Sequence, residues 1–137
     1  MGFVEVGGLG DDYEDKIVAE GEYELRINDA KEQTSKDGAL QYMCIIDIEA
    51  ATSGDEIPQN TAPIFHYLTM PKEDDSSDSR RTKMRFLTRF LKAFSIPFEA
   101  DGFNVEDFSG TTATLLVEQD KYGDNMTNRI KLPPTKD

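Results

Sequence analysis

The chain has 137 residues, and its 27 acidic and 15 basic side chains give a formal net charge of −12 at neutral pH. This length suits a single domain, and a hydrophobic share of 37% excludes a wholly disordered chain. One cysteine excludes an internal disulfide and fits a reducing cytoplasm. No apolar run approaches the ~18 residues of a membrane span, so we expect no membrane partner.

Residues 1–20 are rich in glycine and acidic side chains, and we expect them to form a loosely held N-terminal arm. After the arm, Tyr23, Leu25 and Ile27 alternate with polar residues. This period of two predicts a half-buried strand over 21–31.

The next two strands follow a turn at 34–38, where Asp-Gly supplies residues that tolerate positive φ. In the strand at 39–50 both faces are apolar near the middle, which predicts a central strand or one whose outer face is covered. A third strand is expected at 62–70. Its Phe65 and Tyr67 share one face, but the opposite face is also apolar, so either can be the inner one.

A helix is expected over 79–94, with Asp78 or Ser79 as its N-cap and Pro97 forcing its end. Apolar residues recur at helical spacing and form a stripe that faces the core. The stripe consists of Met84, Leu87, Leu91 and Phe94, widened by Phe86 and Phe90.

The remaining residues predict two more strands after a loop at 98–110 that contains one short turn. The fourth strand is expected at 111–120 and the fifth at 126–132, joined by a hairpin tip at 121–125. The order β-β-β-α-β-β predicts a mainly β domain over 21–134: a five-stranded OB-fold barrel with one helix between strands 3 and 4.

The predicted helix concentrates positive charge in an otherwise acidic chain. It holds six of the fifteen basic residues and no acidic one, namely Arg80, Arg81, Lys83, Arg85, Arg89 and Lys92. Two interpretations stay open. Such a patch can hold a polyanion despite the net charge, because local potential decides where a phosphate binds, or the helix can neutralise an acidic body from within.

The sequence contains no recognisable catalytic or metal-binding motif. His66 is the single histidine, and no Cys-x-x-Cys or phosphate-binding glycine loop is present. Cys44 lies in an apolar run, where a buried structural thiol is expected. We therefore expect a binding protein, with no enzymatic activity, cofactor or metal.

Several segments, in their order and spacing, resemble the OB-fold single-stranded DNA-binding proteins encoded by bacteriophages. The matching segments are Gly21-Glu22-Tyr23, Thr34-Ser35-Lys36-Asp37-Gly38, Leu40-Gln41-Tyr42, Ile46-Asp47-Ile48, Phe90 to Pro97, Asp107-Phe108-Ser109-Gly110, Lys121-Tyr122-Gly123-Asp124-Asn125 and Asn128-Arg129-Ile130. The resemblance covers about 20–132. It implies a protein that coats single-stranded DNA during phage DNA replication and recombination, in the host cell cytoplasm. Its implied partners are single-stranded DNA and phage replication or recombination proteins. A second copy, in a homodimer, is a further candidate partner.

Binding a single strand without sequence preference requires cations along the backbone and aromatic faces for the bases. With no tryptophan in the chain, tyrosine, phenylalanine or histidine must supply the faces. The candidate residues for nucleic-acid binding are Arg26, Lys31, Lys36, Phe65, Tyr67, Arg80, Arg81, Lys83, Lys121, Tyr122, Arg129 and Lys131. Tyr42 is expected in the core.

A second class of function remains open at this point. An acidic, non-enzymatic protein-interaction module would dock a basic partner through its negative surface, with the basic helix as an internal counter-patch.

Overall fold

The computed structural model describes residues 2–134, and for Tyr122 it describes the backbone alone. The main elements are β1 (Gly21–Thr34), β2 (Leu40–Ala51), β3 (Ile64–Thr69), α1 (Ser77–Ala93), β6 (Thr112–Tyr122) and β7 (Asn125–Lys131). The predicted loop at 98–110 contains a small hairpin, β4 (Phe98–Glu99) with β5 (Gly102–Phe103), and a single 3-10 turn at Val105–Asp107.

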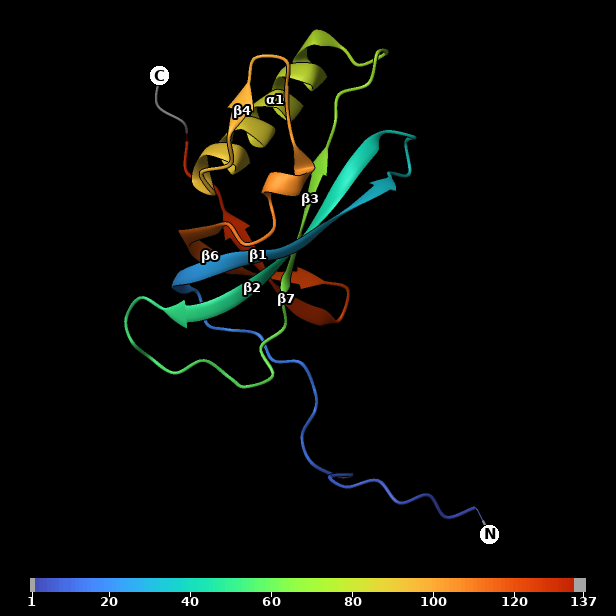
Figure 1. The fold of residues 1–137 in the computed structure, drawn as a ribbon, viewed down its shortest axis with the longest axis vertical. Coiled ribbons are helices and arrows are strands. Elements are labelled where there is room, and N and C mark those ends of the chain that lie inside the picture. The colour runs from blue at the N-terminus through green and yellow to red at the C-terminus, as the bar shows by residue number, and fades with distance from the viewer. Residues whose placement is uncertain (1, 135–137) are drawn as a thin grey trace.

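The long strands form one antiparallel sheet in the order β3-β2-β1-β6-β7, so the predicted mainly β architecture with one helix is confirmed (Figure 1). β2 lies between β3 and β1, as its two apolar faces predict. Two register shifts between β1 and β2, at Glu24/Leu25 and Ile27/Asp29, bend this pair.

The five-stranded sheet is not closed into the expected barrel. β3 and β7 have six and seven residues and lie at the two ends of the strand order, without pairing to each other among the described strands. Their facing side chains line an open groove instead. Because both end strands are short, little backbone is available to complete a ring of hydrogen bonds.

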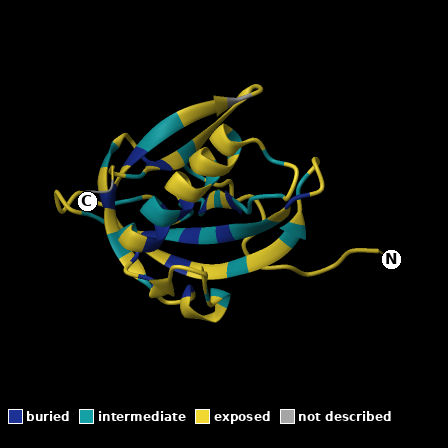
Figure 2. Cartoon of the chain, turned by 90° about the horizontal axis from the view of Figure 1, so that it is seen from above, coloured by how far each residue is buried: buried dark blue, intermediate teal, exposed yellow. Residues whose placement is uncertain are grey.

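The core lies between the sheet and α1, which sits over one end of the strands. Seen from above, the strands curve around the helix (Figure 2). Phe90 is fully buried, and its ring centroid lies 4.8 Å from that of Phe94 and 5.9 Å from that of Phe108. From the sheet, Leu25 and Ile46 contribute fully buried side chains to the same cluster.

The helix differs from its prediction at the N-terminus and in its apolar stripe. It begins at Ser77, and its N-cap is Ser76, whose hydroxyl accepts a hydrogen bond from the Ser79 N–H at 3.1 Å. The prediction of Asp78 or Ser79 as the cap is therefore wrong. Ser76 also offers a side-chain oxygen that can accept a hydrogen bond from the first turn, and it comes earlier in the chain. Met84 and Phe86, expected to face the core, are 38% and 48% exposed.

Within the predicted arm, the last residues contact the body. Lys16 forms a parallel bridge with Thr61, and Val18 is buried. Residues 2–11 contain no helix or strand and extend away from the body (Figures 1 and 2), whereas the Asp12 carbonyl accepts a hydrogen bond from the Asn60 side chain at 2.7 Å and Asp15 lines the groove between β3 and β7.

Candidate nucleic-acid interface

The orientation of β3 determines which aromatic rings reach the surface. Ile64 and Leu68 are buried, and the His66 ring stacks on Phe90 with centroids 5.0 Å apart and planes 5° apart. Alternate residues of a strand face opposite ways, so Phe65 and Tyr67 point outward. Each is 51% exposed.

The outward face of β3 continues onto β2. Tyr67 pairs with Met43 and Phe65 with Ile45, and directly paired residues of antiparallel strands share a face. We call these four side chains the outer platform. Lys31 of β1 pairs with Met43 and adds a cation to the same row. On the apolar outer face of β2, noted in the sequence, Met43 and Ile45 are therefore half-buried beside the exposed Phe65 and Tyr67.

A groove of about 910 Å³ runs between β3 and β7, and Phe65 and Tyr67 form part of its wall. Its polar lining includes Arg129, Asp15 and Asp120. Arg129 lies 3.4 Å from Glu118 and 3.8 Å from Asp120, measured from guanidinium nitrogen to carboxylate oxygen. Exposed pairs of this kind contribute only ~0–1 kcal/mol, so Arg129 can exchange these partners for an external anion.

Tyr67 also lines a second groove, of about 330 Å³, between β3 and α1. The helix contributes Lys83 and the exposed Phe86 to this groove. The guanidinium carbon of Arg89 lies 5.7 Å from the centre of the Phe86 ring, within the range of a cation–π contact. The two grooves meet at Tyr67 and place three exposed aromatic rings on one side of the molecule.

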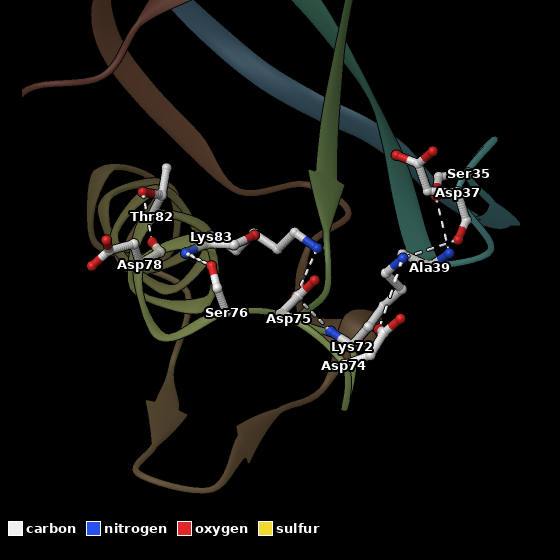
Figure 3. A network of polar contacts seen from close by, with 11 residues as sticks. Ser35, Asp37, Ala39, Lys72, Asp74, Asp75, Ser76, Asp78, Thr82 and Lys83 are labelled. Atoms are coloured by element: carbon white, nitrogen blue, oxygen red, sulfur yellow. Dashed lines mark hydrogen bonds and ion pairs between the residues drawn. The ribbon is translucent and has the colours of Figure 1, made fainter.

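Lys83 belongs to a polar network that connects the start of α1 to the segment before it (Figure 3). Its ammonium lies 2.8 Å from the Asp75 carboxylate, which also accepts a hydrogen bond from the Lys72 N–H at 2.8 Å. The hydrogen bond from Lys83 is the main reason why the pKa of Asp75 is lowered. The Lys72 ammonium in turn donates to the Asp37 carbonyl at 3.1 Å, which links α1 to the β1–β2 turn.

The other predicted cations are exposed and dispersed. Arg26 is held by Glu49 at 3.0 Å. Six others form no ion pair with any residue in 2–134: Lys31, Lys36, Arg80, Arg81, Lys121 and Lys131. The structure thus places Lys31, Phe65, Tyr67, Lys83 and Arg129 around β3, with Lys31 beyond β2 and with Lys83 and Arg129 across the free edge of β3. Arg80 and Arg81 lie at the start of α1, and Lys131 lies at the end of β7.

Two tyrosines need separate description. Tyr42 is partly buried against the core, with its ring edge-on to Phe103 at 6.3 Å and its hydroxyl donating to Glu32 at 3.4 Å. The Tyr122 side chain lies outside the described part of the structure; its backbone ends β6 beside Gly123, which has a φ of +63°.

Sequence reasoning did not single out the exposed Met126 or the half-buried Met43 and Ile45, and it assigned Phe86 to the core. The position of Phe86 on the helix could have indicated that it is exposed. At about 100° per residue, it lies roughly 100° around the helix from Leu87, away from the middle of the buried stripe.

Cys44 is buried, and the His66 ring stacks on the buried Phe90. Burial raises the pKa of the Cys44 thiol to about 12 and lowers the pKa of His66 to about 4. In the part of the chain that the structure describes, no three His, Cys, Asp or Glu side chains are grouped to hold a metal ion. The helix found in the same residues is not long and apolar enough to cross a membrane.

No known protein family matches this chain, and no curated protein is significantly similar to it in sequence.

Proposed function

We propose that this chain binds single-stranded DNA without marked sequence preference, using the outer platform and the groove between β3 and β7. The observation that carries the proposal is the pair Phe65 and Tyr67, each half exposed and adjacent on one strand beside that groove. Half-exposed rings on a sheet are what base stacking requires, since each base offers a π-face whatever its identity.

The spacing of the rings suits an extended strand. Residues two apart on a β-strand lie about 6.8 Å apart, roughly twice the 3.4 Å rise of stacked bases. Each ring can therefore stack on a base of its own only if the nucleic acid is stretched, or if the base between the two rings is left unstacked. A duplex cannot do this without losing its base pairs, so the platform favours single strands.

The charged side chains around the groove determine where the bases and the phosphates of a bound DNA strand would lie. Asp15 and Asp120 lower the potential inside the β3–β7 groove, which favours bases rather than phosphates there. Lys31, which pairs with Met43, and Arg129, which lines the groove, would then bind the phosphates on either side of the bases. Lys121 pairs with Met126, which lines the groove, and so adds a second cation on the same side as Arg129.

The proposal includes the OB-fold and the biological setting implied by the resemblance to phage proteins. The strand order of the sheet and the position of α1 are compatible with an OB-fold whose last pairing, between β3 and β7, is open. On this basis the protein coats single strands during phage DNA replication or recombination in the host cell cytoplasm, together with phage replication or recombination proteins.

A second candidate function is the acidic interaction module that docks a basic partner. It is favoured by the ion pair of Lys83 with Asp75, because this part of the basic helix is neutralised from within. The net charge of −12 would also attract a basic surface.

Fluorescence anisotropy with a short labelled oligo-dT, and with a blunt duplex of equal length, tests the proposal. We expect the single strand to bind more tightly. Phe65→Ala and Tyr67→Ala should each weaken its binding by about 1–3 kcal/mol. Leu116→Ala, which truncates a side chain 49% exposed on β6, is the control. Equal affinity for both nucleic acids would refute the proposal, and binding of an oligolysine peptide alone would favour the interaction module.

A further inference from the structure

The outer side of α1 carries cations that lie outside the proposed DNA surface. Arg85 and Lys92 are exposed, and neither forms an ion pair with any residue in 2–134. At about 100° per residue they lie only about 20° apart around the helix, roughly opposite the buried Leu87. The positive charge of this half of the helix therefore faces the solvent.

Arg89 lies between this outer side and the groove beside β3. Its guanidinium carbon is 5.7 Å from the centre of the Phe86 ring, and Phe86 lines that groove together with Tyr67. The Arg89 Nε is buried and has no hydrogen-bond partner within residues 2–134. No acceptor there holds Nε in place, so the guanidinium can turn toward an external one. We call Arg85, Arg89 and Lys92 the helix ridge.

The spacing of the helix ridge suits a polyanion. With a rise of about 1.5 Å per residue, Arg85 and Arg89 lie about 6 Å apart along the axis, and Arg89 and Lys92 about 4.5 Å apart. The phosphates of one strand lie about 3.4 Å apart along a stacked helix, and they lie farther apart when the strand is stretched. Each cation of the ridge can therefore meet a different phosphate.

The nearby carboxylates leave the helix ridge open. Asp78 is the one acidic residue of α1, and it lies about 10 Å along the axis from Arg85. Glu99 and Asp101 lie on the other flank of the helix, where they line a groove together with Arg80. Because no carboxylate within residues 2–134 pairs with the ridge, it is available to an external anion.

We propose that a bound DNA strand continues past Tyr67 onto α1, with a base on Phe86 and its phosphates on the helix ridge. This inference rests on the proposed function and extends the path of the strand beyond the outer platform and the groove between β3 and β7. Tyr67 lines both grooves and so joins the two parts of the path. An exposed ring beside a cation favours nucleic acid over an acidic protein, because bases stack on aromatic faces and carboxylates do not.

The length of the oligonucleotide separates this inference from the proposed function. An oligo-dT of about six nucleotides covers the platform and its groove, whereas one of about twelve also reaches the helix, within the ~4–16 nucleotides that one OB-fold occupies. Fluorescence anisotropy at several salt concentrations should give a log–log slope that is steeper for the longer strand by about 2, since three more phosphates each release about 0.7 counterions. Arg85→Gln with Lys92→Gln should weaken binding of the longer strand about tenfold or more near 0.1 M salt and leave the shorter strand unaffected.

The control variant is Asn104→Asp with Thr112→Glu, at two exposed positions outside α1 and β3. It lowers the net charge by the same amount and should keep the wild-type difference between the two lengths. The inference is overturned if the glutamine variant weakens both lengths equally, if the control weakens the longer strand as much, or if the longer strand binds wild type no more tightly than the shorter one. Failure of both lengths to bind wild type would refute the proposed function, and this inference with it. Tighter binding of an oligoglutamate peptide than of the longer strand, lost in the glutamine variant, would assign the ridge to an acidic protein and also overturn the inference.

Discussion

The Asn128 side chain is hydrogen-bonded to both backbone polar groups of Val18. Its carboxamide oxygen accepts from the Val18 N–H at 2.8 Å, and its amide nitrogen donates to the Val18 carbonyl at 2.9 Å. A side chain here replaces the partner strand that Val18 lacks, and so attaches the base of the N-terminal arm to β7.

Removing this carboxamide should destabilise the fold. Asn128→Ala leaves the partly buried Val18 N–H without its partner, which costs roughly 1–3 kcal/mol; the Val18 carbonyl keeps its hydrogen bond from the Gln119 amide at 3.1 Å. Asn128→Asp should also destabilise, because a carboxylate has no donor for the Val18 carbonyl. Urea unfolding measures both. Asn104→Ala, an exposed asparagine whose side chain makes no capping hydrogen bond, is the control and should change stability by under ~0.5 kcal/mol.

Substituting two phenylalanines of α1 in turn should show that folding stability and oligonucleotide binding depend on different residues of the helix. Phe90 is fully buried and Phe86 is 48% exposed. Phe90→Ala should cost about 3–5 kcal/mol of unfolding free energy. Phe86→Ala should cost under ~1 kcal/mol but weaken oligonucleotide binding, since its ring lies next to Tyr67 in the groove beside β3. If Phe86→Ala leaves affinity unchanged, the DNA path does not reach the helix.

His66 should make the protein less stable in mild acid. Its folded pKa is about 4, lowered by burial, whereas an unfolded histidine titrates near 6.5. Between these values the unfolded chain binds the additional proton, so stability falls as pH drops from about 6.5 toward 4. By pH 5 the loss should be roughly 1–2 kcal/mol.

Urea titrations of wild type and His66→Phe at pH 7 and pH 5 measure this contribution. The phenylalanine retains an aromatic ring over Phe90 but cannot titrate, so the variant should lose less stability between the two pH values. An identical pH dependence in both proteins would mean that other groups cause the effect.

Oligonucleotide affinity should depend on salt only gently. With about 3–4 phosphates neutralised and about 0.7 counterions released for each, the log–log slope should be roughly −2 to −3. Arg80→Glu with Arg81→Glu should weaken binding to a short oligonucleotide with little loss of stability, because both side chains are exposed and form no ion pair within residues 2–134. A slope near zero would show that cations do not contact the backbone.

The β6–β7 tip provides a further test through Tyr122. It is the last residue of β6, just before the turn at Gly123 and Asp124, and stacking on a base would use the face of its ring. Tyr122→Ala should then weaken binding by about 1–3 kcal/mol, and Tyr122→Phe should have almost no effect. Wild-type affinity in Tyr122→Ala would exclude this tip from the binding surface.

The sequence by itself determined the elements and their order. Alternation at Tyr23, Leu25 and Ile27 indicates β1 because strand side chains repeat every two residues, and all three are buried in the sheet. Helical spacing similarly located α1 and its buried residues Leu87 and Leu91. These signals are local, so they can be read without knowing what packs against them.

Only the tertiary structure decided which strand faces are exposed and which charged side chains are held in ion pairs. Both faces of β3 are apolar, and the packing of α1 on His66 leaves Phe65 and Tyr67 outside. Lys83 resembles its basic neighbours in sequence, yet it alone among the α1 cations is paired with Asp75 within the described residues. Whether β3 meets β7 depends on the curvature of the whole sheet. Each of these outcomes rests on contacts between residues distant in the chain, which neither periodicity nor composition encodes.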